Sequence, residues 1–335
     1  MQCIKICSEF KKKVNAETQI LGEIHSIFTS SFNVMLGDGT LITILARNRP
    51  MMMNSIKTKE SLSFYNLLTI KNKIDIHNPV VFEKTKMYLS NDSKQSVVFD
   101  YGDTELWDGR PDLQLQAVSW TIFSNRMSII ADFIKKNKKT EGISSVVYFL
   151  ADRSREIEEL YIENLEPSQA DLFIKKPFIN FIDAYKKAVL TGCVNNLKEK
   201  ASKIIGFGIG LTPSMDDFLS GIMITMIYGV NNFGFSVNKI VSVNNQVIDD
   251  NLHRTTKVSA EMLRHAAFGR TNEHLKSLMI SIFSQSSQAN MVMSSTRDRL
   301  NCYMNNEQSI GETSGIDTLF GVYLGCCLIR FLKEV

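Results

Sequence analysis

A glycine-rich turn directly before an apolar helix is the part of this sequence best suited to chemistry. Its residues, GFGIGLTPSMDDFLSG, span Gly206–Gly221. Alternating glycines allow left-handed backbone and let a ligand approach the chain closely. We expect Thr212 to cap the helix and Pro213 to be its first residue, so that free N–H groups and the positive helix end converge. The segment therefore predicts a phosphate or carboxylate site. The turn residues expected to bind the anion are Gly206, Gly208, Gly210 and Thr212.

Two adjacent aspartates, Asp216 and Asp217, follow in the first turn of that helix. The next residues, 218–230, are apolar on nearly every face, so the helix should be buried. Two acids in a first turn can simply complement the helix dipole. Beside an anion site, however, they would repel the anion unless they hold a proton, a cation or a substrate N–H group. The pair, together with Ser214, supplies the candidate catalytic residues.

The two acids should have different roles, because successive helical residues point about 100° apart. We expect Asp217 and Ser214 to face the ligand and Asp216 to hold backbone or neighbouring donors. His265 is another candidate acid or base, although a buried histidine inside a helix is as readily a packing residue.

Two later segments have the same design as the glycine-rich turn. Residues 254–270 begin with hydroxyl side chains and end in a glycine cap followed by arginine, and residues 311–318 place small polar residues before a second apolar helix. Ordinary capping explains either segment alone, whereas three such termini in one helical region favour a shared pocket. The ligand-binding residues expected from these segments are Arg254, Thr255, Thr256, Ser259, Arg270, Thr313, Ser314, Gly315 and Asp317.

Composition excludes several other classes of protein. The chain has 335 residues, 44% of them hydrophobic, and a net charge of +3, which gives no reason to expect nucleic acid as a partner. Its six cysteines lack the paired spacing of a zinc site, and we expect reduced thiols. We expect no membrane span, because the apolar segments are short and broken by glycine, and no signal peptide, which predicts a cytoplasmic protein. No cofactor is firmly implied, although Mg²⁺ could bridge Asp216 or Asp217 to a phosphate.

The elements that must position these residues change in character near residue 115. Residues 1–115 predict a small β-rich, barrel-like domain and residues 116–335 a mainly α-helical domain, an α+β fold. No internal repeat is evident. Residues 231–251 are expected to be a connector and Val146–Leu150 an isolated strand. The expected strands are 18–30, 33–36, 40–46, 61–70 and 80–89, with a hairpin turn at 37–39; the expected helices are 116–136, 168–190, 194–204, 213–228, 258–267, 272–283 and 316–331.

Three motifs together resemble the AllH family. They are GxGxGLTPSxDDFLxG from Gly206, TTxxSxxMLRxAxxG from Thr255 and TSGxDTLxG from Thr313, and the resemblance is strongest over residues 205–324. Two positions depart from the family pattern. Met215 stands where we expect glycine, which would crowd the floor of the pocket, and Glu312 stands where we expect histidine, which would change its charge.

The resemblance implies a subunit of the oxamate carbamoyltransferase complex of anaerobic allantoin breakdown, working with AllG-like and FdrA-like subunits. Phosphate would attack the ureido carbonyl of oxalurate and give carbamoyl phosphate and oxamate. Backbone N–H donors at the turn could stabilise the negative charge that develops on the carbonyl oxygen of the substrate. Asp217 could transfer a proton, and Arg254 or Arg270 could bind the second of the two anions, a carboxylate and a phosphate. Two alternatives stay open. One is a non-catalytic anion-binding or regulatory subunit, and the other is a Mg²⁺-dependent phosphotransferase, which is disfavoured because Leu211 rather than lysine follows the last glycine.

Overall fold

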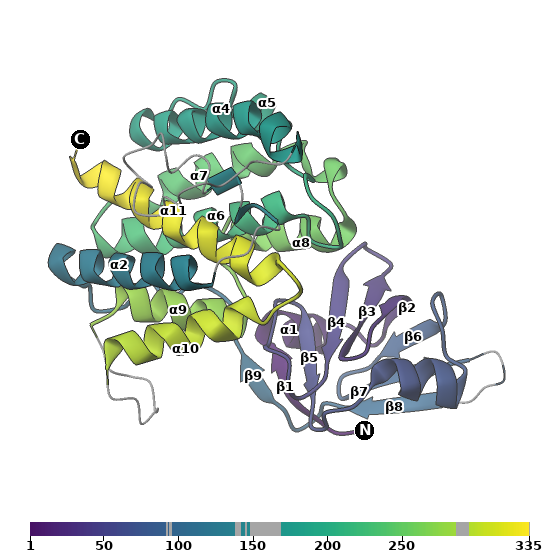
Figure 1. Ribbon diagram of the computed structural model, residues 1–335. Coiled ribbons are helices and arrows are strands. Elements are labelled where there is room, and N and C mark those ends of the chain that lie inside the picture. Colours follow the sequence, from purple (N-terminus) through teal and green to yellow (C-terminus); the bar gives the residue numbers. More distant parts are fainter. Residues whose placement is uncertain are drawn as a thin grey trace. The chain divides into compact units, whose positions relative to one another are not determined.

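The computed structural model describes residues 1–91, 93, 96–137, 142–144, 146–147, 169–285 and 295–334 (Figure 1). The chain divides into two compact units, unit 1 over Met1–Gly109 and unit 2 over Arg110–Val335. Each unit has its own cluster of buried apolar residues. The sequence boundary was expected after residue 115, and the division lies after Gly109.

Unit 1 is a nine-stranded sheet that curls into a half-barrel. The prediction of a β-rich, barrel-like N-terminal domain is confirmed. The strand order is β8-β7-β6-β2-β3-β4-β5-β1-β9, in which the β4–β5 and β1–β9 pairs are parallel. Neighbouring strands otherwise run antiparallel. The strands are β1 (Cys3–Cys7), β2 (Ile20–Ile27), β3 (Ser31–Leu36), β4 (Leu41–Leu45), β5 (Ser55–Thr58), β6 (Pro79–Phe82), β7 (Lys86–Ser90), β8 (Ser96–Asp100) and β9 (Glu105–Trp107).

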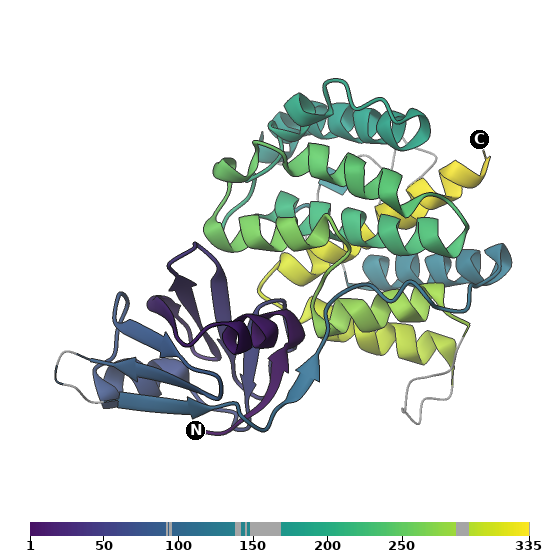
Figure 2. The ribbon, with the colours of Figure 1, turned by 180° about the vertical axis from the view of Figure 1, so that it is seen from behind.

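Aromatic side chains fill the core of unit 1. Helix α1 (Ser8–Ala16) packs Phe10 edge-on against Phe82 of β6, with ring centroids 5.2 Å apart. Phe64 contacts Phe32 of β3 in the same way, at 5.0 Å. Such aromatic contacts add to the burial of apolar area. Figure 2 shows α1 lying against the curled strands of this unit.

Two expectations for unit 1 differ in outcome. The hairpin turn at Gly37–Gly39 is confirmed, since Gly39 has a φ of +82° and donates to the carbonyl of Leu36 at 2.9 Å. The strand expected over 61–70 is wrong, because Asn66–Lys71 forms the π-helical segment η1. Phe64 and Leu68 are both buried and lie four residues apart, which is helical spacing. Strands β1, β5, β8 and β9 were not anticipated, and 80–89 forms two strands instead of one.

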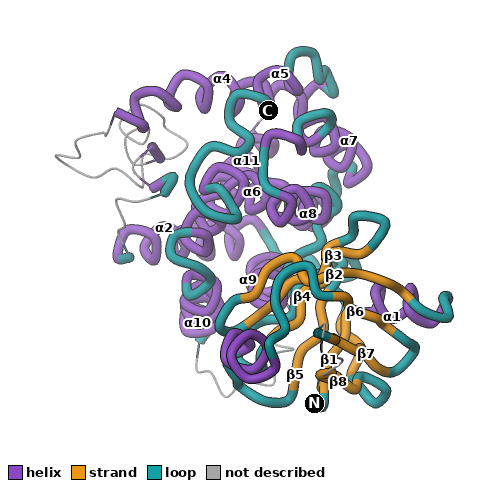
Figure 3. The backbone as a smooth tube through the Cα atoms, turned by 90° about the vertical axis from the view of Figure 1, so that its right-hand side faces the viewer, coloured by secondary structure: helices purple, strands orange, loops and turns teal. Residues whose placement is uncertain are grey.

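Unit 2 is built around one buried helix, α6 (Ser214–Asn232), which packs against α7, α8, α9 and α11. Figure 3 shows α6 beside α8 and α11. Every side chain of α6 from Ser214 to Val230 is buried, as its apolar composition predicted. The other described helices are α2 (Trp120–Lys136), α4 (Gln169–Thr191), α5 (Leu197–Ala201), α7 (Val237–Ile248), η3 (Leu252–Arg254), α8 (Lys257–Ala266), α9 (Glu273–Phe283), α10 (Thr296–Gln308) and α11 (Ser314–Glu334).

Part of the expected connector 231–251 is helix α7, so that expectation is wrong. Ser236 caps the helix, and Ile240, Val243 and Val247 are buried at intervals of three and four residues. The β-branched residues and asparagines of this segment are weak helix formers, and packing against α6 outweighs that weakness. Val146 and Val147 are helical rather than extended, while the remainder of the strand expected at 146–150 lies outside the described residues.

Helix α11 is long and apolar enough to cross a membrane by length and composition, contrary to the expectation that every apolar segment is too short. However, 83% of its most apolar window is buried inside the protein. Core helices of soluble proteins have the same length and composition, and α11 packs along α6 in this way. All six cysteines are free thiols, and burial raises the pKa of Cys3 to about 12.

Candidate functional site

The glycine-rich turn adopts the left-handed backbone that its sequence predicted. The φ angles of Gly206, Gly208 and Gly210 are +81°, +123° and +94°. A Cβ added at Gly208 would lie 2.5 Å from the backbone nitrogen of Ser214, so this position admits only glycine, whereas Gly210 has open space around it. Within the described part of the chain, the N–H groups of Gly208, Gly210 and Ser214 donate no hydrogen bond. The turn thus presents backbone donors at the start of a helix.

The cap of α6 differs from the expectation. The helix begins at Ser214, Pro213 precedes it, and no side chain caps the first turn. The N–H groups of Asp216 and Asp217 both donate to the carbonyl of Pro213, at 2.8 and 3.2 Å. Thr212 is therefore free for another contact. Its hydroxyl lies 2.9 Å from the hydroxyl of Ser314, at the start of α11.

This hydroxyl contact shows that the N-termini of α6 and α11 meet, as expected for the two polar helix starts. The helices approach closely below that contact. A Cβ added at Gly221 would lie 2.2 Å from the carbonyl oxygen of Thr318, and one added at Gly321 would lie 2.1 Å from that of Phe218. The two approaches are reciprocal, so each glycine admits the backbone of the other helix.

A short repeat in the sequence underlies this pairing, so the expectation of no internal repeat is wrong here. Both helices carry the pattern S-x-x-D-x-x-x-G in the same position relative to their starts. The matched residues are Ser214 with Ser314, Asp217 with Asp317, and Gly221 with Gly321. Because the glycine contacts are reciprocal, Asp217 and Asp317 occupy equivalent places at the entrance of the helix pair.

Asp216 has the role expected of it, as acceptor for the backbone and for neighbouring donors. One carboxylate oxygen accepts the N–H of Gly206 at 2.8 Å, and the other accepts the hydroxyls of Ser259, at 2.6 Å, and Thr255. Burial raises the pKa of Asp216, and these hydrogen bonds oppose that rise. The carboxylate ties the turn, α6 and the start of α8 together, which makes it a structural group.

Asp217 has a different environment from Asp216. Its side chain is buried, and among the described residues its Oδ2 atom has no hydrogen-bond partner. Burial raises its pKa well above the usual range, the hydroxyls of Ser314 and Thr212 lower it, and the charges of Asp317 and Asp216 raise it further. An unpartnered buried carboxyl oxygen is costly, which is typical of a group kept for function.

The carboxyl group of Asp317 is held by a segment distant in sequence. The N–H of Ile143 donates to its Oδ1 at 2.8 Å. Gly142 has a φ of +68°, and an added Cβ there would lie 2.4 Å from the same oxygen. Neither Gly142 nor Ile143 was identified from the sequence. No motif marks these residues, and only the folded chain brings them to α11.

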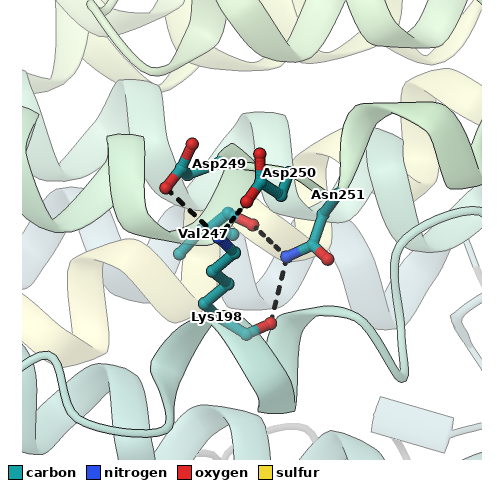
Figure 4. Close-up of polar contacts among 5 residues, drawn as sticks. All are labelled: Lys198, Val247, Asp249, Asp250 and Asn251. Atoms are coloured by element: carbon teal, nitrogen blue, oxygen red, sulfur yellow. Dashed lines mark hydrogen bonds and ion pairs between the residues drawn. The ribbon is translucent and has the colours of Figure 1, made fainter.

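The segment that carries Thr255 and Thr256 is fixed by a polar contact between α5 and α7 (Figure 4). The buried Asn251 donates to the carbonyls of Lys198 and Val247, both at 3.0 Å. Lys198 in turn pairs with Asp249 and Asp250 at the surface. Since exposed ion pairs contribute little stability, Asn251 is the main connection. It holds α5, which leads into the glycine-rich turn, beside the segment that supplies donors to Asp216.

Several predicted ligand residues use backbone or side-chain groups for contacts inside the protein. Thr256 caps α8 and donates to the carbonyl of Leu211. Gly315 donates to Ile310 at 3.0 Å, and its Cα lies against the carbonyl of Glu307, so it serves packing. Thr313 accepts the N–H of Asp317 at 2.9 Å.

The two arginines are separated by the structure. Arg254 is exposed, and its carbonyl lies against Gly206, next to the turn. Arg270 lies beyond the other end of the ten-residue helix α8, about 15 Å along its axis, and stacks on Phe268. It therefore does not join the turn. His265 lies near that same end, where burial and Arg270 lower its pKa to about 4, so it is a neutral packing histidine at pH 7.

The two departures from the family pattern differ in exposure. The side chain of Met215, directly before the acid pair, is fully buried in the hydrophobic core of unit 2, and its effect on the floor of the pocket stays a prediction. One helical position, about 100°, separates it from Ser214 and directs it inward. Glu312 is exposed in the loop before α11.

Two family models match the chain and together cover most of it. The first, oxamate carbamoyltransferase subunit AllH, matches residues 204–326 and contains α6, α8 and the first part of α11. The second, the AllH family N-terminal domain, matches residues 2–103, which hold the half-barrel except strand β9. The chain belongs to the AllH family. No curated protein and no solved structure matches it.

Membership of the AllH family indicates an oxamate carbamoyltransferase subunit, and a subunit implies a complex with other chains. The AllH match contains Asp216, Asp217 and Asp317, whereas Gly142 and Ile143 lie before it. Among the described residues, no three histidine, cysteine, aspartate or glutamate side chains gather as a metal site. A Mg²⁺ ion bound here would therefore need oxygen ligands from its phosphate or from water.

Proposed function

We propose that this chain binds a small carboxylate or carbamoyl compound at the N-termini of α6 and α11 and serves carbamoyl transfer between oxalurate and phosphate. The observation that supports it is the pairing of backbone donors at Gly208, Gly210 and Ser214 with Oδ2 of Asp217, which has no hydrogen-bond partner among the described residues. Anion-binding donors beside a proton-transfer group are what this reaction requires.

The residues suit the bonds that change. A phosphate oxygen attacks the ureido carbon of oxalurate, the carbon–nitrogen bond breaks, and the leaving nitrogen of oxamate takes a proton. Backbone donors of the turn stabilise the negative charge that develops on the carbonyl oxygen. Asp217 is the candidate proton donor, because burial raises the pKa of its carboxyl well above the usual range, and it would accept the proton in the reverse direction. Arg254, beside the turn, is the candidate partner for the second anion.

A non-catalytic anion-binding subunit is the second candidate. It is favoured by the internal hydrogen bonds of Asp216, Thr255 and Ser259, which leave fewer groups for chemistry than the sequence suggested. In either case we propose AllG-like and FdrA-like subunits as partners, because the family resemblance implies them. Purified chain that binds ligand but shows no turnover until these subunits are added would favour the non-catalytic role.

The binding site is tested by titration calorimetry with phosphate, oxamate and carbamoyl phosphate. Gly210→Val should abolish binding, because a side chain at a φ of +94° strains the turn and redirects its N–H groups. Gly234→Val is the matched control. Its φ is +76° and its surroundings are equally open, but it lies past the opposite end of α6. Equal affinities in the two variants would show that the turn is only a structural loop.

A further inference from the structure

Arg126 on α2 carries a buried positive charge away from the glycine-rich turn. Its side chain is 8% exposed. Among the described residues, its hydrogen bonds come from Nη1 alone, which donates to the carbonyls of Ile282, at 2.9 Å, and Ser284, at 3.0 Å. Helix α9 ends at these carbonyls, so the arginine caps the C-terminus of that helix. Capping explains the position of Nη1 and leaves the rest of the guanidinium group to be explained.

The other edge of the same guanidinium group is not used within the described part of the chain. Nε is buried there without a hydrogen-bond partner. Nε and Nη2 form the edge with which an arginine binds two oxygens of an oxyanion at once. A buried N–H group without an acceptor is costly, and nearly all such groups in folded proteins are satisfied. This edge of Arg126 is therefore suited to an acceptor that binds from outside.

A second arginine lies near the first. Helices α2, α9 and α10 pack against one another (Figure 1), and Arg299 belongs to α10. Burial lowers the pKa of Arg126, and the nearby charge of Arg299 lowers it further. Within the described ranges, Arg299 bonds the hydroxyl of Thr296, at 3.2 Å, and neither arginine has a carboxylate partner. Two like charges of this kind, one of them buried, are stabilised by a bound anion.

We propose that Arg126 and Arg299 bind a phosphate-type oxyanion where α2, α9 and α10 meet. Arg126 would present its Nε–Nη2 edge to two oxygens, and the partly exposed Arg299 would bind a further oxygen. Two positive charges suit a doubly charged anion, of which inorganic phosphate is the smallest probe. Nη1 stays on the carbonyls of α9, so the helix keeps its cap when the anion binds.

This site is distinct from the one at the starts of α6 and α11. Phe283, which lies between the two capped residues, stacks on Tyr228 of α6, with ring centroids 6.4 Å apart. Because a helix rises about 1.5 Å per residue, Tyr228 lies about 20 Å along α6 from Ser214. An anion on Arg126 therefore does not share a pocket with the glycine-rich turn. It would join three helices and stabilise the folded chain in proportion to its occupancy.

Calorimetric titration of the whole chain with inorganic phosphate, at constant ionic strength, tests the proposal. The Gly210→Val chain, whose turn should no longer bind anions, should still bind one phosphate. In that background, Arg299→Ala should weaken binding about tenfold or more, because a charge-assisted hydrogen bond is lost. Arg297→Ala is the matched control, since it removes the same charge from the same helix, but from a side chain that pairs with Asp132, at 3.2 Å. Its affinity should match that of the Gly210→Val chain.

A second variant tests the edge of the guanidinium group itself. Arg126→Lys keeps a positive charge and donors for the carbonyls of α9, but it has no planar edge for two oxygens. In the Gly210→Val background it should keep the fold, measured by circular dichroism, and bind phosphate about tenfold more weakly. A folded Arg126→Lys chain with unchanged affinity would overturn the proposed site.

Two further results would overturn it. One is the absence of phosphate binding in the folded Gly210→Val chain, and the other is equal affinity in the Arg299→Ala and Arg297→Ala variants. The anion site at the turn is judged separately, by the difference between wild type and Gly210→Val. If Gly210→Val folds poorly, the wild-type background carries the same test. There Arg299→Ala should remove one of two phosphate sites, and Arg297→Ala should remove neither.

Discussion

At the scale of single residues, the two adjacent aspartates lie in different environments, which suit a structural role for Asp216 and the functional role proposed for Asp217. The carboxylate of Asp216 accepts the N–H of Gly206 and two hydroxyls, whereas Oδ2 of Asp217 is buried without a hydrogen-bond partner among the described residues. The difference follows from helical geometry, because neighbouring side chains point about 100° apart and meet different segments.

Replacement of Asp216 should therefore reduce stability. Asp216→Asn presents an NH₂ group to donors that need an acceptor, so we expect a loss of about 1–3 kcal/mol in the free energy of unfolding. Urea titration followed by circular dichroism measures it. An unchanged midpoint would mean that the three hydrogen bonds to this carboxylate are dispensable.

Replacement of Asp217 should instead reduce catalysis. In a complex reconstituted with the partner subunits, Asp217→Asn should lower turnover by about 10²–10⁴-fold, because the side chain keeps its shape but can no longer transfer a proton. The melting temperature should change little, since the oxygen that is replaced has no partner among the described residues. Similar modest losses of rate and melting temperature in both asparagine variants would show that the chemistry lies elsewhere.

Glu307 is a second buried acid, and it predicts a pH dependence of stability. Burial raises the pKa of its carboxyl from 4.5 to about 7, and the side-chain amide of Asn272 donates to that carboxyl at 3.2 Å. The folded state thus binds the proton more tightly than the unfolded state. The contribution of Glu307 to the free energy of unfolding is therefore most favourable below pH 4.5. It falls as the pH rises toward 7 and is constant above that.

Glu307→Gln should remove this pH dependence. The difference in unfolding free energy between the variant and wild type should shift in favour of the variant by on the order of 3 kcal/mol as the pH rises from 4.5 to 8. Urea titrations of both proteins across that range measure the gain, and other titrating groups cancel in the comparison. Parallel stability curves would contradict a raised pKa for Glu307.

At the scale of elements, the α6–α11 pair is the part of the fold that creates the site. Its close approach depends on glycine at two reciprocal positions, Gly221 and Gly321, each in contact with the backbone of the other helix. This crossing brings the two helix starts together, so that Thr212 meets Ser314 and both aspartates face one entrance. The positive ends of the two helix dipoles also lie side by side, which favours acidic side chains and anions there.

Gly221→Ala and Gly321→Ala should each destabilise unit 2 by about 3 kcal/mol or more, because the added methyl group meets backbone that cannot move aside without parting the helices. Thermal unfolding followed by circular dichroism measures the effect. Gly37→Ala is the control, since an added Cβ there meets nothing within 4 Å. Comparable small losses at all three positions would contradict a close helix crossing.

At the scale of the whole molecule, the chain consists of two units with separate hydrophobic cores. Unit 1 buries its own aromatic cluster, and unit 2 buries α6 among its neighbours. Residues 1–109, produced alone, should therefore fold cooperatively, with a β-type circular dichroism spectrum and a sigmoidal urea transition. A spectrum of unfolded chain, or a transition without cooperativity, would show that the half-barrel depends on the rest of the protein.

The sequence by itself determined the local features of this protein. Gly206, Gly208 and Gly210 specified a left-handed turn before a buried helix, and the change from β-rich to helical segments specified the α+β order of the chain. Such features can be read from neighbouring residues alone, because backbone preferences and the spacing of apolar residues depend on only a few consecutive positions. By the same criterion, the spacing of Ile240, Val243 and Val247 could have revealed α7.

Only the tertiary structure decided which groups the site contains. Thr255 and Ser259 appeared to be ligand donors until the fold placed them on Asp216. The N–H of Ile143 bonds to Asp317, 174 residues further along the chain, and no local pattern marks that contact. A side chain's partner depends on segments that packing brings from far along the chain. The pattern around Asp217 therefore gave its position in the sequence, while the fold showed that one oxygen of its carboxyl has no hydrogen-bond partner among the described residues.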